Sequence, residues 1–178
     1  DGDYVFSIPG NDDAAATGDL DITCEVAING TAANYVTIDA SALDRVFDVR
    51  PSGNLSLTGV SVVGGLDIAG TGGGIRNEGV LTLLRTEVRD NRADTDTVSP
   101  SLGGGVYSTG ILTVRESSIW DNSAGGTIPW ASGGGVYATS GTFTNVAIFG
   151  NTLPPPWGFT GGGGIASAAP GGLTLRNC

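Results

Sequence analysis

The residues best suited to chemistry in this chain are carboxylates, and many of them lie in its N-terminal third. Asp19 and Asp21 are two positions apart, so on a strand both side chains point to the same side and can share a cation such as calcium. Neither an EF-hand spacing nor a Gly-Gly-x-Gly-x-Asp nonapeptide accompanies them. These two aspartates are therefore the candidate calcium ligands, and solvated side chains or turn caps are the alternative.

A second group, Asp44, Arg45 and Asp48, is the one combination that suggests carbohydrate chemistry. Enzymes that cleave polysaccharides need several carboxylates, or calcium with a basic residue, converging on one groove. A simpler interpretation is a salt-bridged surface, with Phe47 and Val49 in the core, because the three residues alternate between strand faces. The chain contains neither His nor Lys. Acid–base catalysis would thus depend on carboxylates, and a Ser–His or Cys–His nucleophile system is excluded.

The elements that must position these groups follow a repeat of about 30 residues. A glycine-rich phrase recurs at steps of 31, 30 and 29 residues, as Gly73-Gly74-Ile75, Gly104-Gly105-Val106, Gly134-Gly135-Val136 and Gly163-Gly164-Ile165. Within each unit, apolar and polar residues alternate in short runs bounded by Gly and Asn, which is typical of strands separated by turns. The pattern predicts an all-β fold, a right-handed parallel β-helix of about five to six coils, in which each strand pairs with its copy in the next coil.

Aligning the repeats assigns the side chains to positions. The predicted inward stack contains Leu81, Leu83, Leu112, Val114, Phe143, Leu173 and Leu175. The predicted outward column contains Thr82, Thr113, Thr142 and Thr174. Asn91, Asn122 and Asn151 fall at one corner, where stacked amides can bond from coil to coil. The glycines mark another corner, where positive φ or close backbone approach excludes a Cβ.

A flat ice-binding surface is one further use for an outward Thr column. Such a surface would require a second rank of Thr beside the first. The neighbouring outward positions are Leu84, Arg115, Thr144 and Arg176, so only one rank is predicted.

The Gly-Gly-Gly-Ile/Val units and their Val/Ile-x-x-Asn endings resemble the short repeats of polymorphic outer-membrane proteins. The first third resembles the start of bacterial CSLREA-type right-handed β-helix proteins, through residues 17–23, 37–39, 43–49 and 57–60. Together the two resemblances cover nearly the whole chain, although the Cys-Ser-Leu-Arg-Glu-Ala stretch that names the second family does not occur. The resemblance implies a bacterial extracellular or cell-surface protein, in a family whose members are mostly non-catalytic.

Length and charge agree with this interpretation. The chain has 178 residues, and we expect one domain, 1–178, with degenerate coils over 1–65 and regular repeats over 66–178. The net charge of −10, without a basic stripe, argues against nucleic-acid binding and against anionic membranes. No apolar run reaches membrane-spanning length, so membrane insertion by this segment is not expected.

Insertions occur at the same place in successive repeats, over residues 92–102, 123–132 and 152–160. They must therefore emerge from one edge of the solenoid. Either they fold back over the flank, or they display Trp130, Trp157 and Phe159 to a protein partner.

The two ends of the chain suggest self-association. The C-terminal coil stops in mid-repeat, and the apolar run from Tyr4 to Ile8, which includes Phe6, is suited to complete a neighbour's coil. Cys24 and Cys178 are too far apart for an intrachain disulfide. They are either small apolar side chains or partners in an intermolecular bond. All five residues are therefore candidates for an end-to-end contact.

These observations predict a non-catalytic extracellular structural protein without a cofactor, apart from the calcium candidates. It would be a surface or matrix module that displays loops and assembles end to end into fibres. Other surface proteins or glycans are further candidate partners. The alternative is a carbohydrate-active β-helix enzyme, a polysaccharide lyase or glycoside hydrolase, which a groove with three converging carboxylates would favour.

Overall fold

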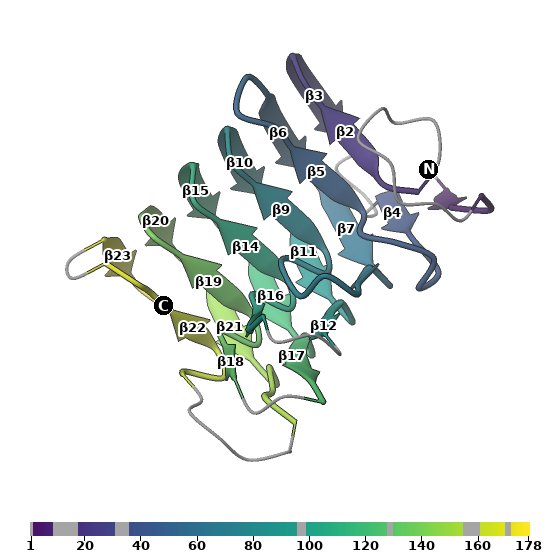
Figure 1. Ribbon diagram of the computed structural model, residues 1–178. Helices are drawn as coiled ribbons and strands as arrows, with labels where there is room; N and C mark the ends of the chain where they lie inside the picture. The colour runs from purple at the N-terminus through teal and green to yellow at the C-terminus, as the bar shows by residue number, and fades with distance from the viewer. Residues whose placement is uncertain are drawn as a thin grey trace.

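The chain folds into a parallel β-solenoid of about five turns, which the computed structural model shows as a stack of coils with the two termini at opposite ends (Figure 1). The structure describes residues 2–8, 18–30, 36–95, 99–127, 130–154, 161–169 and 172–178. Over these residues the regular secondary structure is entirely β, as predicted from the alternating pattern. Each coil passes in turn through three sheets, which we call B, C and A.

These three sheets extend along the whole solenoid, and each contains six parallel strands. Sheet A is formed by β1 (Asp3–Val5), β4 (Val36–Asp39), β7 (Val60–Val63), β11 (Glu87–Arg89), β16 (Ser118–Trp120) and β21 (Ala147–Phe149). Sheet B is formed by β2 (Leu20–Ile22), β5 (Phe47–Val49), β9 (Ile75–Asn77), β14 (Val106–Ser108), β19 (Val136–Ala138) and β22 (Ile165–Ala166). Sheet C is formed by β3 (Glu25–Asn29), β6 (Asn54–Thr58), β10 (Val80–Leu84), β15 (Ile111–Arg115), β20 (Gly141–Thr144) and β23 (Leu173–Arg176).

Two smaller sheets cover one flank, where the sequence predicts insertions. Sheet D is formed by β8 (Leu66–Asp67), β12 (Arg92–Thr95) and β17 (Ser123–Gly126), and sheet E by β13 (Ser101–Leu102) and β18 (Ala131–Ser132). Ala93, Ala124 and Ala131 form a small buried cluster against which Leu153 packs. The described parts of the insertions therefore fold back over the flank, which was one of the two expected outcomes.

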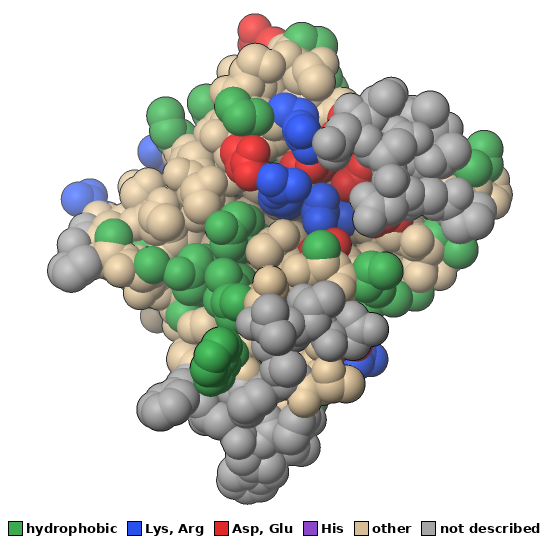
Figure 2. Space-filling model, in the orientation of Figure 1, with side chains coloured by type: hydrophobic (Ala, Val, Ile, Leu, Met, Phe, Trp, Pro, Cys, Tyr) green, Lys and Arg blue, Asp and Glu red, His purple; other side chains and the backbone are tan. Residues whose placement is uncertain are grey.

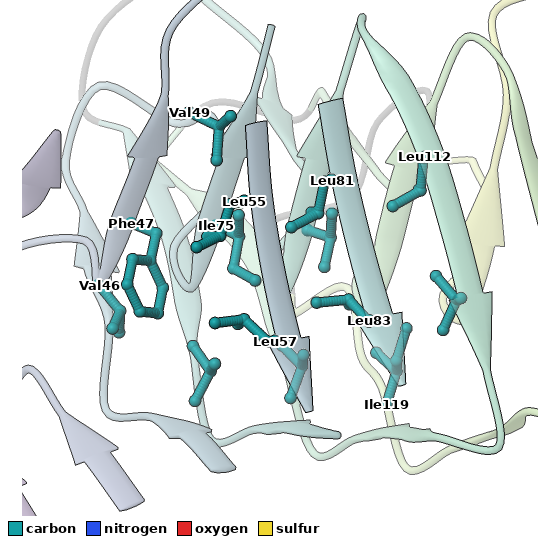
Figure 3. Close-up of a cluster of buried hydrophobic side chains, with 14 of the residues drawn as sticks. Val46, Phe47, Val49, Leu55, Leu57, Ile75, Leu81, Leu83, Leu112 and Ile119 are labelled. Atoms are coloured by element: carbon teal, nitrogen blue, oxygen red, sulfur yellow. The ribbon is translucent and has the colours of Figure 1, made fainter. Parts of the chain in front are cut away.

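The core is a stack of aliphatic and aromatic side chains between sheets A, B and C (Figure 3). Leu83, Val114 and Phe143 pair in consecutive coils and are fully buried, as predicted. The degenerate early copy has the same register, because Leu55 pairs with Leu81. Leu175 pairs with Phe143 in the expected register but is 49% exposed, since no further described coil covers it.

The predicted asparagine corner is a hydrogen-bonded ladder. The Nδ2 atom of Asn91 donates to Oδ1 of Asn122 at 3.0 Å, and Nδ2 of Asn122 donates to Oδ1 of Asn151 at 2.9 Å. Each Oδ1 also accepts the backbone N–H of the preceding rung, at 3.1 and 3.0 Å. Each amide thus accepts a backbone N–H at the corner and joins two coils, which explains why asparagine recurs at this position in each repeat.

The glycine corner is also confirmed. Gly72, Gly103 and Gly133 have φ of 72°, 64° and 64°, a region that favours glycine. At Gly103 a Cβ would lie against the carbonyl oxygen of Val106, so close packing and positive φ both require glycine.

The outward Thr column is present in sheet C. Its members pair in register across successive coils, in the order Ser56, Thr82, Thr113, Thr142 and Thr174. The second outward row contains Thr58, Leu84, Arg115, Thr144 and Arg176, so the Thr rank remains single.

Candidate functional site

The main concentration of charge lies around Arg45, in the turn before β5. Its Nη1 atom is 3.2 Å from Oδ2 of Asp19, in the preceding coil. Its Nη2 atom is 2.9 Å from Oδ1 of Asp67 in β8, and its Nε donates to the carbonyl oxygen of Gly72 at 2.9 Å. Arg45 therefore joins consecutive coils through side chains, in addition to the backbone ladders.

Asp48 is the second centre of this charge cluster. Its Oδ2 atom is 2.9 Å from Nη1 of Arg50, 3.5 Å from Nη1 of Arg76 and 3.6 Å from Nη1 of Arg45. Asp48 pairs with Arg76 in sheet B and points to its outer side. Figure 2 shows basic and acidic side chains gathered into one patch on this face of the molecule.

The prediction of a salt-bridged surface at Asp44, Arg45 and Asp48 is wrong in one respect. The three residues are only 8%, 7% and 2% exposed, so the charges are buried. The physical reason is that Arg45 and Asp48 also contact Asp19, Asp67 and Arg76 from other parts of the solenoid, which strand alternation within residues 44–48 does not reveal. Phe47 and Val49 are in the core, as predicted.

Burial changes the acidity of this cluster. It raises the pKa of Asp19 to about 7, although the nearby Arg45 lowers it. Burial also raises the pKa of Asp44, whose Oδ1 accepts the backbone N–H of Arg45 at 2.7 Å. Among the described residues, Oδ1 of Asp48 is buried without a hydrogen-bond partner. The cluster thus contains more carboxylate than its buried guanidinium neutralises.

The calcium candidates have different neighbours. Asp19 contacts Arg45, whereas Asp21 pairs with Asp48 in sheet B. In the described ranges no group of three or more His, Cys, Asp or Glu side chains is arranged to hold a metal ion.

Two aromatic pairs on the outer faces were not anticipated from the sequence. Tyr107 and Tyr137 stack at 5.7 Å on sheet B, and Trp120 and Phe149 stack at 5.8 Å on sheet A. Arg89, one coil earlier, lies over the Trp120 ring at 5.4 Å from its centroid. The signal was available, because the members of each pair occupy identical positions in consecutive repeats.

The predicted interaction loops are only partly within the described residues. Trp130 is 49% exposed, immediately before β18, while Trp157 and Phe159 lie outside the described residues. A pocket of about 230 Å³ lies on the same flank and is lined by Ile68, Asp94, Thr95 and Thr127. Asp94, in its wall, forms an ion pair with Arg92.

The candidate end-to-end residues lie at the two ends of the solenoid. Tyr4 and Ile8 are exposed at the N-terminal end, where β1 pairs with β4, and Phe6 packs against the core. Cys24 and Cys178 are both exposed and unbonded to each other, as expected from their positions in the repeat.

In the described part of the chain, no helix is long and apolar enough to cross a membrane. No protein-family model, curated protein or solved structure matches this chain.

Proposed function

We propose that this chain is a non-catalytic structural module that stacks end to end with copies of itself. One observation carries the proposal. Sheets A, B and C run from the first coil to the last, with β1, β2 and β3 at one end and β21, β22 and β23 at the other. Because all pairings within these sheets are parallel, both ends present the same three sheets with the same strand direction.

The side chains at the ends support this proposal. Rows that are buried in the middle coils are partly exposed in the end coils, at Tyr4, Val26, Ile28, Ile148, Ile165, Leu173 and Leu175. Another coil stacked on either end would cover these rows and pair the edge backbone groups. A second copy of this chain supplies a coil of matching shape, an instance of strand addition.

The register argues against a disulfide across the junction. Thr174 belongs to the same column as Ala27, through Ser56, Thr82, Thr113 and Thr142. Cys178 lies four positions after Thr174, and Cys24 lies three positions before Ala27. A stack in continuous register therefore separates the two cysteines by seven positions, far beyond the roughly 7 Å that a disulfide allows between Cα atoms.

The charge cluster favours a structural role over a catalytic one. The side chains of Asp19, Asp48 and Asp67 all contact Arg45, and none is more than 7% exposed. A general acid or base must reach its substrate, whereas these groups contact one another. Extracellular or cell-surface location, and glycans or surface proteins as further partners, belong to the same proposal and rest on the resemblance to bacterial surface proteins.

Stacking is tested by a charge placed at one end. Leu175→Lys puts an ammonium into the inward row of the last coil, where the next copy would bury it. The matched control is Ile111→Lys, because Ile111 is 63% exposed on the outer face of sheet C. We expect sedimentation over a range of concentrations to show assembly for the wild type and the control, and monomers for Leu175→Lys. Equal melting temperatures would show that both variants are folded, and equal association of both variants would overturn the proposal.

A carbohydrate-active enzyme remains the second candidate because one observation favours it. Three carboxylates converge on Arg45, and the pKa of Asp19 is raised to about 7, as in a general acid. The test is product release from a panel of neutral and acidic polysaccharides. Activity that Asp19→Asn abolishes in a folded protein would favour the enzyme and overturn the structural proposal.

A further inference from the structure

We propose that the buried carboxylates around Arg45 form a proton-binding lock that holds the N-terminal edge of the solenoid together at mildly acidic pH and loosens it above neutral pH. The lock itself is independent of stacking. Its effect on assembly rests on the proposed function, because the N-terminal edge is one of the surfaces that would meet a neighbouring copy.

The first step is the balance of charge. Asp19, Asp44, Asp48 and Asp67 are each less than a tenth exposed. Among the described residues, Arg45 is the only basic residue that is equally buried. Arg50 and Arg76, which contact Asp48, have side chains that are 26% and 28% exposed, so four buried carboxylates face one buried and two partly exposed guanidiniums. A cluster with more buried negative than positive charge is costly unless it binds a proton or another cation.

The second step is the unmet hydrogen bonding. Oδ1 of Asp48 is buried and accepts no hydrogen bond from the described residues. A protonated carboxyl carries an O–H donor, which a carboxylate lacks. Binding a proton therefore removes a negative charge and supplies a donor within the same buried space.

The groups around Asp19 decide which way it titrates. After burial itself, the strongest influence is Arg45, which favours the ionised form, and Asp44, Asp48 and Asp21 oppose ionisation. The other charged groups nearby do not offset the combined effect of burial and carboxylate repulsion, which favours the protonated form of Asp19. Asp67 competes for Arg45, and the guanidinium groups of Arg50 and Arg76 are directed to Asp48.

The sign of the pH effect follows from these shifts. The pKa of Asp19 rises from 3.8 to about 7 in the fold, so between these values the folded state holds a proton that the unfolded state has released. Stability from this group is therefore greatest below pH 3.8 and is lost as pH rises toward 7. Between pH 5 and pH 8, the shift corresponds to an increase of about 100-fold in the unfolding equilibrium constant.

Ionisation of Asp19 would weaken the attachment of the edge strand β2. Asp19 immediately precedes β2, which is the N-terminal edge of sheet B, and the N–H of Leu20 donates to the carbonyl oxygen of Val46 at 3.0 Å. When Asp19 ionises, repulsion from Asp44 and Asp48 acts on the residue that anchors this strand. Weaker anchoring of β2 disrupts the edge to which a neighbouring copy would add.

The test compares wild type, Asp19→Asn and the control Asp121→Asn, which changes an exposed corner carboxylate. We expect the melting temperature of wild type and control to fall between pH 5 and pH 8, and that of Asp19→Asn to fall much less. In the wild type, carboxyl ¹³C chemical shifts should give Asp19 a titration midpoint near 7. An ordinary midpoint near 4, or identical pH profiles for all three proteins, would overturn the lock.

Sedimentation at pH 5.5 and pH 8.5 separates the lock from the proposed function. If stacking occurs, we expect wild type and control to assemble less at the higher pH, and Asp19→Asn to assemble equally at both. Monomers at both pH values, with the expected titration and melting profiles, would contradict stacking and leave the lock standing. If the wild type assembles equally at both pH values, the claim that the lock regulates stacking would be overturned.

Discussion

The N-terminal coils and the regular coils join successive turns by different chemistry. Over residues 18–72 the main buried side-chain connections are ionic, with Arg45 linking Asp19 to Asp67 and to the carbonyl of Gly72. Over residues 73–166 the main buried connections are neutral, through the amide ladder from Asn91 to Asn151, and the Arg85–Glu116 ion pair is exposed. The neutral ladder uses the same residue in each coil, whereas the ionic cluster uses each member once.

The difference explains why the sequence of residues 73–166 is visibly repetitive and that of residues 18–72 is not. An amide is both donor and acceptor, so identical residues can bond to one another along a column. Carboxylates cannot do this without a proton or a cation between them. An ionic junction must therefore be assembled from unlike residues, and it also becomes sensitive to pH.

Arg45→Met should lower the free energy of unfolding more than any of the substitutions below. It leaves Asp19, Asp48 and Asp67 buried without their shared cation, and loss of one partner of a buried ion pair costs about 3–5 kcal/mol. Arg115→Met is the control, because Arg115 is exposed on sheet C. Urea unfolding measures both changes. Equal effects would mean that the ionic junction does not stabilise the N-terminal coils.

Asn122→Ala should have the next largest effect. It removes the donors to Asn151 Oδ1 and to the Val88 carbonyl, and the acceptor for the Asn91 backbone N–H. Buried groups left without partners predict a loss of about 2–3 kcal/mol, independent of pH between 5 and 8. Asn54→Ala, on the outer face of sheet C, should change stability by less than about 0.5 kcal/mol. A loss at Asn122 as small as at Asn54 would contradict the ladder.

Glu116→Gly should have the smallest effect and the opposite sign. Glu116 has φ of 51° at a corner where the N-terminal coil has Gly59, with φ of 63°. The strain energy released when glycine adopts the left-handed conformation should exceed the entropic cost of fixing glycine there. The free energy of unfolding should therefore rise by about 0.5 kcal/mol. The exposed pair with Arg85, at 3.9 Å, contributes little. Gly59→Glu should lose stability in the same unfolding assay, and a loss in both variants would refute this view of the corner.

Much of the fold follows from the sequence because alternation within a strand gives the direction of each side chain and the repeat length gives the strand register. The alternation around Leu81 and Leu83 fixes which side chains point inward, and the repeat fixes their partners in the next coil. The Asn corner was predictable for the same reason. The flank strands β12 and β17 were not, because they pair with each other across insertions that have no shared sequence.

The candidate site was less predictable because its contacts are long-range and occur once. Asp44, Arg45 and Asp48 were selected from the sequence, yet their burial depends on Asp19 and Asp67, from other coils. Burial in turn determines acidity. The raised pKa of Asp19 therefore has no signal in its own neighbourhood of the sequence.

Hydrogen exchange of the edge strands tests end-to-end stacking most directly. Raising the protein concentration at pH 5.5 should slow exchange in β3 (Glu25–Asn29) and β23 (Leu173–Arg176), whose outer edges have no strand partner among the described residues and would pair in the stack. Exchange in β10 (Val80–Leu84), which is paired on both sides within one molecule, should not change. Slower exchange confined to the two edge strands is the predicted result. Exchange in both edge strands that is independent of concentration would contradict stacking.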